Sequence, residues 1–209
     1  MLLLSAVTVK VEVPVPPLSG SRLEDALAKF RGDILQTPPR YSALKVAGRR
    51  AYAVARAGGE VDLVARPVTI DDIRLLNWNE TELRLEVSCS KGTYIRALVR
   101  DIAVSLGTVG HLAGLVRTRV GPFSLSESLT LEDIAGRGVA NTLLPASRAM
   151  PEAPKYSADR RAVELLLNGR AIHVPGLRAD CVWVYDPDGR LICLGSADGV
   201  LLRPRLNLC

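Results

Sequence analysis

Ser90-Lys91-Gly92-Thr93-Tyr94-Ile95-Arg96 joins a strand pattern to a helix pattern. Before it, apolar and polar residues alternate over residues 83–89, which is the period of a half-buried strand. After it, apolar residues recur at helical spacing over residues 95–106, and Gly107 is the expected C-terminal cap. Rigid elements on both sides hold such a turn, so it suits the placement of functional side chains. The sequence therefore predicts a site at Tyr94 and Arg96.

The same stretch carries a resemblance to a known family. Residues 89–96, C-S-K-G-T-Y-I-R, resemble a segment of the bacterial tRNA pseudouridine-55 synthases of the TruB type. A second block agrees, over residues 30–34, 36, 38–46, 48–52 and 55–56, and the resemblance runs from about Val11 to the C-terminus. It implies an α+β fold. Residues 1–150 would form an N-terminally incomplete pseudouridine-synthase body with an antiparallel sheet, and residues 151–209 a small β-rich, PUA-like RNA-binding module.

The resemblance also implies roles for three side chains. Tyr94 matches a tyrosine that lies against the target uracil, Arg96 an arginine that pairs with the nucleophilic aspartate, and Leu115 a leucine that lines the uracil pocket. The family's substrate is uridine-55 in the tRNA T-loop, and the isomerisation requires no cofactor. Other interpretations stay open from the residues alone: Tyr94 and Leu115 as core residues, and Arg96 as a surface arginine paired with Asp101 or Glu86.

The family's nucleophile is absent from this sequence. It belongs to an N-terminal G-x-L-D-P-x-A-x-G motif, and none of the chain's aspartates lies between a leucine and a proline. No catalytic aspartate is therefore assigned, and we expect the chain alone to be inactive. It is either part of an ordinary synthase, as a fragment or a mis-started reading frame, or a short paralogue that binds RNA without catalysis. Whether another chain supplies the aspartate stays open.

Charge is concentrated in one segment. The chain has a net charge of +5, and residues 29–56 hold seven basic residues and one acidic residue. Aromatic residues among the bases suit phosphate contacts and base stacking, although a charged run is more often a solvated helix face. We expect the T-arm of tRNA as the partner of a monomer. The expected RNA-binding residues are Tyr41, Lys45, Arg49, Lys91 and Arg117.

The remaining composition indicates a cytoplasmic protein without a metal site. Four cysteines form no C-x-x-C pair and the two histidines are far apart in the sequence, so a zinc site is not expected. No membrane span is predicted. An unrelated protein-binding domain would require both sequence blocks to match by chance.

Further elements follow from periodicity and turn residues. Ser21 and Glu24 are the expected capping box of a helix with an apolar face over residues 23–30. Pro145, Pro151 and Pro154 indicate a linker. Strands are predicted over residues 7–15, 68–76, 82–89, 182–185, 191–194 and 200–204, and helices over residues 44–57, from 130 and over 158–167, with a helical turn over 111–116.

Overall fold

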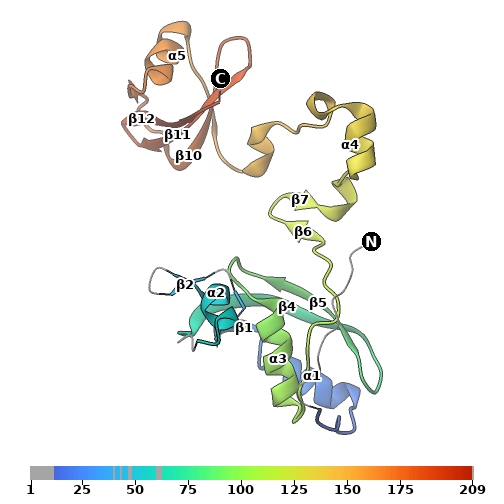
Figure 1. Cartoon of the computed structure of the whole chain (residues 1–209). Helices are drawn as coiled ribbons and strands as arrows, with labels where there is room; N and C mark the ends of the chain where they lie inside the picture. The colour runs from blue at the N-terminus through green and yellow to red at the C-terminus, as the bar shows by residue number, and fades with distance from the viewer. Residues whose placement is uncertain (1–11, 40, 43, 47–48, 60–62, 209) are drawn as a thin grey trace. The chain divides into compact units, whose positions relative to one another are not determined.

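The computed structural model describes residues 12–39, 41–42, 44–46, 49–59 and 63–208. It divides into two compact units, Met1–Leu115 and Val116–Cys209, and each is described by itself. Helices accompany mainly antiparallel sheets in the two units, so the predicted α+β class is confirmed (Figure 1). The functional division at residue 150, into catalytic body and RNA-binding module, stays a prediction.

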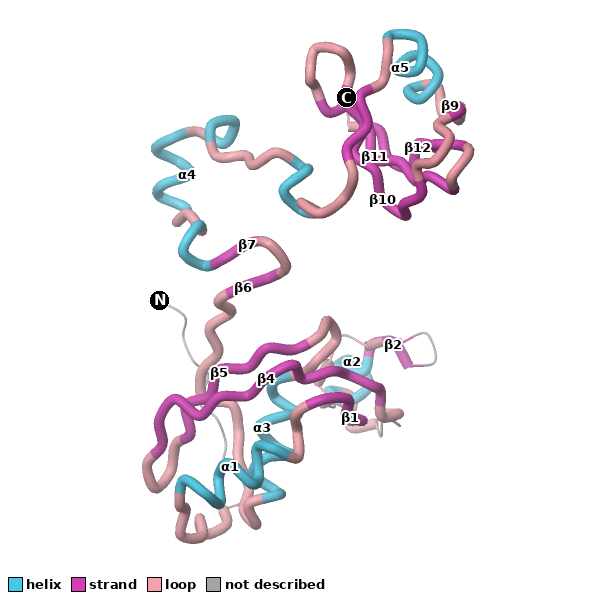
Figure 2. Tube along the Cα trace, turned by 180° about the vertical axis from the view of Figure 1, so that it is seen from behind, coloured by secondary structure: helices cyan, strands magenta, loops and turns pink. Residues whose placement is uncertain are grey.

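The first unit is built on a three-stranded antiparallel sheet. Strand β4 (Arg66–Trp78) lies between β1 (Gly32–Gln36) and β5 (Leu83–Cys89). Helices α1 (Gly20–Ala28) and α3 (Ile95–Ser105) lie against the sheet (Figure 2). Their apolar faces meet the middle of β4, because removal of these side chains from water is the main stabilising term. The fully buried residues are Leu23 and Leu27 of α1, Ile70 and Ile73 of β4, and Leu98 of α3.

The strands over 68–76 and 82–89 and the helix over 95–106 are confirmed within one or two residues at most ends. The capping box at Ser21 is wrong, because the N-cap of α1 is Ser19, whose hydroxyl accepts the Arg22 backbone N–H at 3.3 Å. Glu24 instead pairs with Arg31 at 2.7 Å.

The single helix predicted over residues 44–57 is wrong in its first half. Strands β2 (Lys45–Val46) and β3 (Arg49–Arg50) pair as a hairpin, and α2 (Ala51–Arg56) follows. A short connection containing glycine favours a hairpin, and helical spacing of a few apolar residues does not exclude one. The predicted strand over 7–15 lies mostly outside the described residues, and residues 12–15 form no strand. Residues 111–116 form no helical turn.

The second unit begins with short elements. They are the hairpin of β6 (Arg119–Val120) and β7 (Phe123–Ser124), helix α4 (Leu131–Arg137), and the 3-10 turns η1 (Leu125–Glu127), η2 (Val139–Asn141) and η3 (Ala146–Ala149). Thr130 and Asp133 form a capping box at the start of α4, where the sequence predicts a helix.

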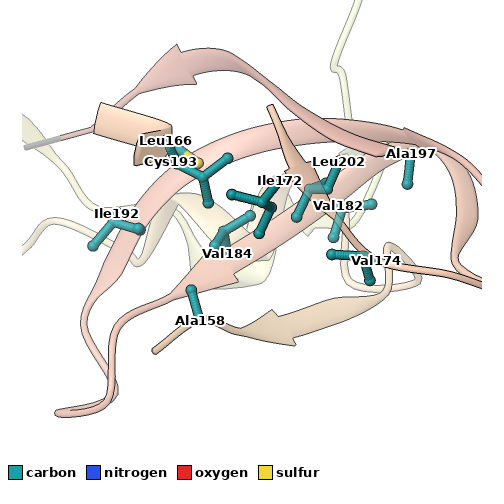
Figure 3. Packing of buried hydrophobic residues seen from close by; sticks show 10 residues of the cluster. All are labelled: Ala158, Leu166, Ile172, Val174, Val182, Val184, Ile192, Cys193, Ala197 and Leu202. Atoms are coloured by element: carbon teal, nitrogen blue, oxygen red, sulfur yellow. The ribbon is translucent and has the colours of Figure 1, made fainter. Parts of the chain in front are cut away.

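A five-stranded sheet completes the second unit. The strand order is β8-β10-β11-β12-β9, with only β8 parallel to its neighbour. The bounds are β8 (Lys155–Ser157), α5 (Arg160–Leu167), β9 (Ile172–His173), β10 (Arg178–Tyr185), β11 (Leu191–Asp198) and β12 (Leu201–Asn207). Figure 3 shows its core, a cluster that includes Leu166 of α5, Cys193 and Val184. The predicted strands over 182–185, 191–194 and 200–204 and the helix over 158–167 are confirmed.

A carboxylate closes the hairpin between β11 and β12. Asp198 Oδ1 accepts the backbone N–H groups of Leu201 at 2.8 Å and Val200 at 3.0 Å, and Oδ2 accepts from Arg203 at 2.6 Å. The Leu201 backbone bond, then the Arg203 and Val200 bonds, hold the pKa of Asp198 far below its ordinary value. The ionised carboxylate therefore stabilises the folded unit.

We expect Asp198→Asn to lower the urea midpoint of the second unit at neutral pH. A lowered folded pKa gives stability that is present above the unfolded pKa of about 3.9 and is lost as the pH falls through the folded value. The difference between the variant and the wild type should therefore shrink below about pH 4. Fluorescence of the buried Trp183 reports the transition. Asp188→Asn, in an exposed turn, is the control, and an equal difference at every pH would contradict this role.

Candidate functional site

The turn before α3 is hydrogen-bonded to β4. Ser90 donates its backbone N–H to the Thr69 carbonyl at 2.8 Å, and its hydroxyl accepts the Thr69 N–H at 3.0 Å. Within the turn, the Thr93 hydroxyl donates to the Ser90 carbonyl at 2.9 Å, and Gly92 has φ of 88°, a conformation that side-chain-bearing residues rarely adopt. The turn thus leaves the sheet in one defined direction.

Tyr94 is the N-cap residue of α3 and is half-buried, so it is not the core tyrosine of the alternative interpretation. Its carbonyl accepts the backbone N–H groups of Ala97 and Leu98 at 3.0 Å each. Its own N–H donates to Gln36 Oε1 at 2.8 Å. Both sides of the Tyr94 backbone are therefore bonded, one to the helix and the other to the side chain that ends β1.

Two arginines one helical turn apart attach α3 to the loop after β1. Arg96 Nη2 donates to the Tyr41 carbonyl at 2.9 Å, and Arg100 Nη2 donates to the Thr37 carbonyl at 3.2 Å. Together with the bond from Tyr94 to Gln36, these contacts join residues that lie more than fifty positions apart in the chain. The N-terminal half of α3 is thus hydrogen-bonded to Gln36, Thr37 and Tyr41.

The predicted surface partners of Arg96 are engaged elsewhere. Asp101 pairs with Arg100 at 2.7 Å, and Glu86 pairs with Arg74 at 3.0 Å. Within the described part of the chain, Arg96 is exposed and no carboxylate oxygen lies within 4.0 Å of it. The alternative interpretation as a surface ion pair with Asp101 or Glu86 is therefore wrong. A guanidinium has five N–H donors, so most of those of Arg96 are available to a further group.

A small pocket adjoins Tyr94. Its volume is about 130 Å³, and its lining comes from β1, β4, the turn before α3 and the loop after β1. A drug-sized ligand usually requires a pocket of about 300–1,000 Å³, so these residues alone do not enclose one. Two exposed cationic side chains give the pocket a positive edge. The lining residues are Gln36, Pro38, Leu44, Arg66, Pro67, Val68, Lys91, Gly92 and Tyr94.

The structure places the other predicted site residues as follows. Tyr41 is 56% exposed, beside Arg96 through its carbonyl, and Lys91 is exposed at the pocket. Leu115 is also 56% exposed, so its interpretation as a core residue is wrong. Arg117 is exposed in the second unit. The side chains of Lys45 and Arg49 lie outside the described part of the chain.

Sequence reasoning assigned no role to Gln36, Arg100 or Arg66. Gln36 is 2% exposed, whereas in the sequence it stands out only as a member of the second sequence block. Burial of a glutamine leaves no periodic signal, and a contact from Arg100 to a distant carbonyl leaves none either. Arg66 extends β4 before the predicted start of the strand, where it pairs with Gln36 across the sheet.

Two negative findings apply to the described residues. No cluster of three or more histidine, cysteine, aspartate or glutamate side chains lies there in a metal-binding arrangement. Of the helices in those same residues, none has both the length and the apolar character needed to cross a membrane.

Family models cover most of the chain. Residues 5–95 match the TruB family pseudouridylate synthase N-terminal domain, and residues 96–147 match the tRNA pseudouridylate synthase B C-terminal domain. The boundary between the two matches falls between Tyr94 and Arg96, so the site is built from both.

Known proteins agree with these matches. The tRNA pseudouridine synthase B of Aromatoleum aromaticum is 42% identical over 180 residues, which are 85% of this chain and 58% of that protein. The enzyme of the same name from Caldanaerobacter subterraneus subsp. tengcongensis is 39% identical over 194 residues, 92% of this chain and 67% of that protein. The chain thus spans about three-fifths to two-thirds of these relatives.

Solved structures support the fold. An H/ACA ribonucleoprotein bound to a substrate RNA containing 2′-deoxyuridine includes a chain with a TM-score of 0.68 and 21% identity, covering 94% of this chain and 63% of that one. A Cbf5–Nop10–Gar1 complex gives a TM-score of 0.66 at 22% identity, with 93% and 63% covered. From the two family models and the identity to curated relatives, this chain belongs to the TruB family of pseudouridylate synthases.

Proposed function

We propose that the chain supplies the uracil-facing and RNA-facing parts of a tRNA pseudouridine synthase that acts on uridine-55 of the T-loop, and that alone it binds this RNA without isomerising it. The observation that carries the proposal is Arg96. Its exposed guanidinium, two residues after Tyr94 in the chain, donates to the Tyr41 carbonyl, and none of the described carboxylates pairs with it. The sequence also has no aspartate in the Leu-Asp-Pro context of the family motif.

The chemistry assigns a role to each of these groups. Isomerisation breaks the bond from C1′ to N1 of uracil and forms a bond from C1′ to C5; the proton at C5 leaves and N1 takes up a proton, so the composition is unchanged. A flipped base requires a flat surface in a pocket, which the ring of Tyr94 provides. A guanidinium near a carboxyl group favours its ionised form, so Arg96 would keep a nucleophilic aspartate charged. Leu115 would contribute apolar surface to the same pocket.

The charged surface suits the phosphates of a T-arm. Lys91 and Arg66 lie at the pocket next to Tyr94, and Tyr41 is exposed on the loop that Arg96 holds. Lysine and arginine contacts to phosphates release counterions and supply much of the affinity for RNA. Exposed aromatic rings add base stacking. Lys45 and Arg49 on the hairpin and Arg117 of the second unit would extend this contact, as would the PUA-like module.

The second candidate function is RNA binding without any catalytic partner. The missing Leu-Asp-Pro context favours it, because the chain alone then has no nucleophile. Translation of the DNA upstream of Met1 discriminates the two functions: an in-frame aspartate motif supports the synthase, and its absence supports the binding protein. Either function places the protein with tRNA in the cytoplasm.

Lys91→Glu tests the RNA surface. We expect it to weaken binding of a T-arm stem-loop about tenfold and to lower the slope of log affinity against log salt by about one, because one phosphate contact is lost and a repulsion is added. Filter binding at several salt concentrations measures both quantities. Arg84→Glu, an exposed charge on β5, is the matched control. Equal affinity of the Lys91 variant and the control would show that the pocket is not part of the RNA-binding surface.

A further inference from the structure

We propose that Gln36 is a positioning residue for Tyr94, a role that rests on the proposed function of the Tyr94 site. Gln36 ends β1, is 2% exposed, and accepts the backbone N–H of Tyr94 through Oε1 at 2.8 Å. Its backbone is paired with Arg66 in the sheet. A side chain fixed by the sheet therefore holds the residue whose ring is assigned to the base.

The bond from Gln36 holds a part of Tyr94 that the other contacts of the turn do not reach. The Ser90 and Thr69 bonds fix the start of the turn, four residues before Tyr94. The helix holds the Tyr94 carbonyl through Ala97 and Leu98. Only the N–H side of Tyr94 remains, and Gln36 holds it. With both peptide groups of Tyr94 bonded to separate elements, the direction of its Cα–Cβ bond is set.

A buried carboxamide such as that of Gln36 is not explained by packing alone. Its Nε2 is buried and has no hydrogen-bond partner among the described residues. A buried donor without a partner destabilises the folded state, and an apolar side chain of similar length would avoid that loss. The favourable polar contact of the Gln36 side chain is thus the hydrogen bond from the Tyr94 N–H to Oε1. A variant can therefore remove this bond while the free energy of unfolding changes little, which makes the proposal testable.

Gln36→Met is the informative variant. It leaves the Tyr94 N–H unpaired but removes the unpaired Nε2, so the two changes oppose each other in stability. We expect the urea midpoint of the first unit to stay near that of the wild type. Hydrogen exchange at the Tyr94 amide should accelerate, while exchange at the Ser90 amide should not. Gln36→Glu keeps an oxygen acceptor and should restore slow exchange at Tyr94.

RNA binding supplies the functional measurement. We expect Gln36→Met to weaken binding of a T-arm stem-loop about three- to tenfold, because a displaced ring loses part of its stacking on the base. Leu35→Met, on the same strand but exposed, is the control and should bind within about twofold of the wild type. In a Tyr94→Ala background, Gln36→Met should change the affinity by less than about twofold, because its effect passes through the ring.

The outcomes separate the two proposals. If the wild-type chain binds a T-arm stem-loop and a scrambled hairpin equally well, the proposed function is overturned, and the role of Gln36 falls with it. If the wild type discriminates them but Gln36→Met binds as well as the wild type, only the positioning role is overturned. A Gln36→Met loss of the same size with and without Tyr94 overturns it as well, since the effect is then not transmitted through that ring.

Discussion

Fusion of an N-terminal segment that carries the family's G-x-L-D-P-x-A-x-G motif is expected to give this chain pseudouridine synthase activity. No described carboxylate pairs with Arg96, and the motif supplies an aspartate that can do so. An aspartate nucleophile divides one difficult substitution into two easier steps. The segment is taken from the Aromatoleum aromaticum relative, of which the chain covers 58%. Release of tritium from T-arm RNA with 5-tritiated uridine measures the reaction, because the hydrogen at C5 is lost on isomerisation.

Two control variants of this fusion test the added aspartate and Arg96 separately. Asn in place of the aspartate of the added motif should lower the rate by at least about a thousandfold, while T-arm binding persists. Arg96→Met in the active fusion should also lower the rate, because the carboxylate loses its counter-ion. Equal release from the fusion and its Asn variant would show that the added aspartate is not the nucleophile, and would refute the assignment of Arg96.

Leu98→Ala is expected to destabilise the first unit by about 2–5 kcal/mol, the usual effect of deleting a buried leucine side chain. Leu98 is 1% exposed and belongs to the same core cluster as Leu27 and Ile73, which come from the other helix and the central strand. The substitution therefore removes apolar contacts of α3 and leaves a cavity. Loss of this packing should also release the turn that carries Tyr94 and weaken T-arm binding.

Urea unfolding tests this expectation with one reporter. Trp78 lies at the end of β4, where its ring is close to Gly20 at the start of α1, so its fluorescence follows the first unit. Trp183→Phe in every variant removes the signal of the second unit. Val104→Ala on the same helix is the control, since Val104 is 63% exposed and its truncation should change the stability by less than about 0.5 kcal/mol. Similar losses for both variants would contradict the core assignment.

The turn and the helix that follows it were predictable because both periods are strong in the sequence. Residues 83–89 alternate and residues 95–106 repeat at helical spacing, and each pattern ends where the structure changes direction. Strand β1 was not predictable from periodicity. Leu35 in this strand is 74% exposed, whereas Gln36 is buried, so the strand reverses the usual relation of polarity and burial.

The sequence alone points to Tyr94 and Arg96 as candidate site residues, but it does not reveal the contacts that hold them. The family resemblance pointed to Tyr94 and Arg96, and the structure adds the partners of both. Those partners are a glutamine side chain and a backbone carbonyl, which any sequence can provide. Similarly, the spacing of Ser21 and Glu24 predicts a capping box, but in the structure Ser19 is the N-cap, which local sequence spacing does not reveal.

The most direct measurement is a paired assay on the 209-residue chain itself. Filter binding of a T-arm stem-loop and tritium release from the same 5-tritiated RNA are measured in one preparation. Binding above that of a scrambled hairpin, with tritium release at background, is the result we predict if Tyr94 and Arg96 have the proposed roles and the chain supplies no nucleophile. Tritium release from the chain alone would contradict this account, because an aspartate outside the family motif would then perform the reaction.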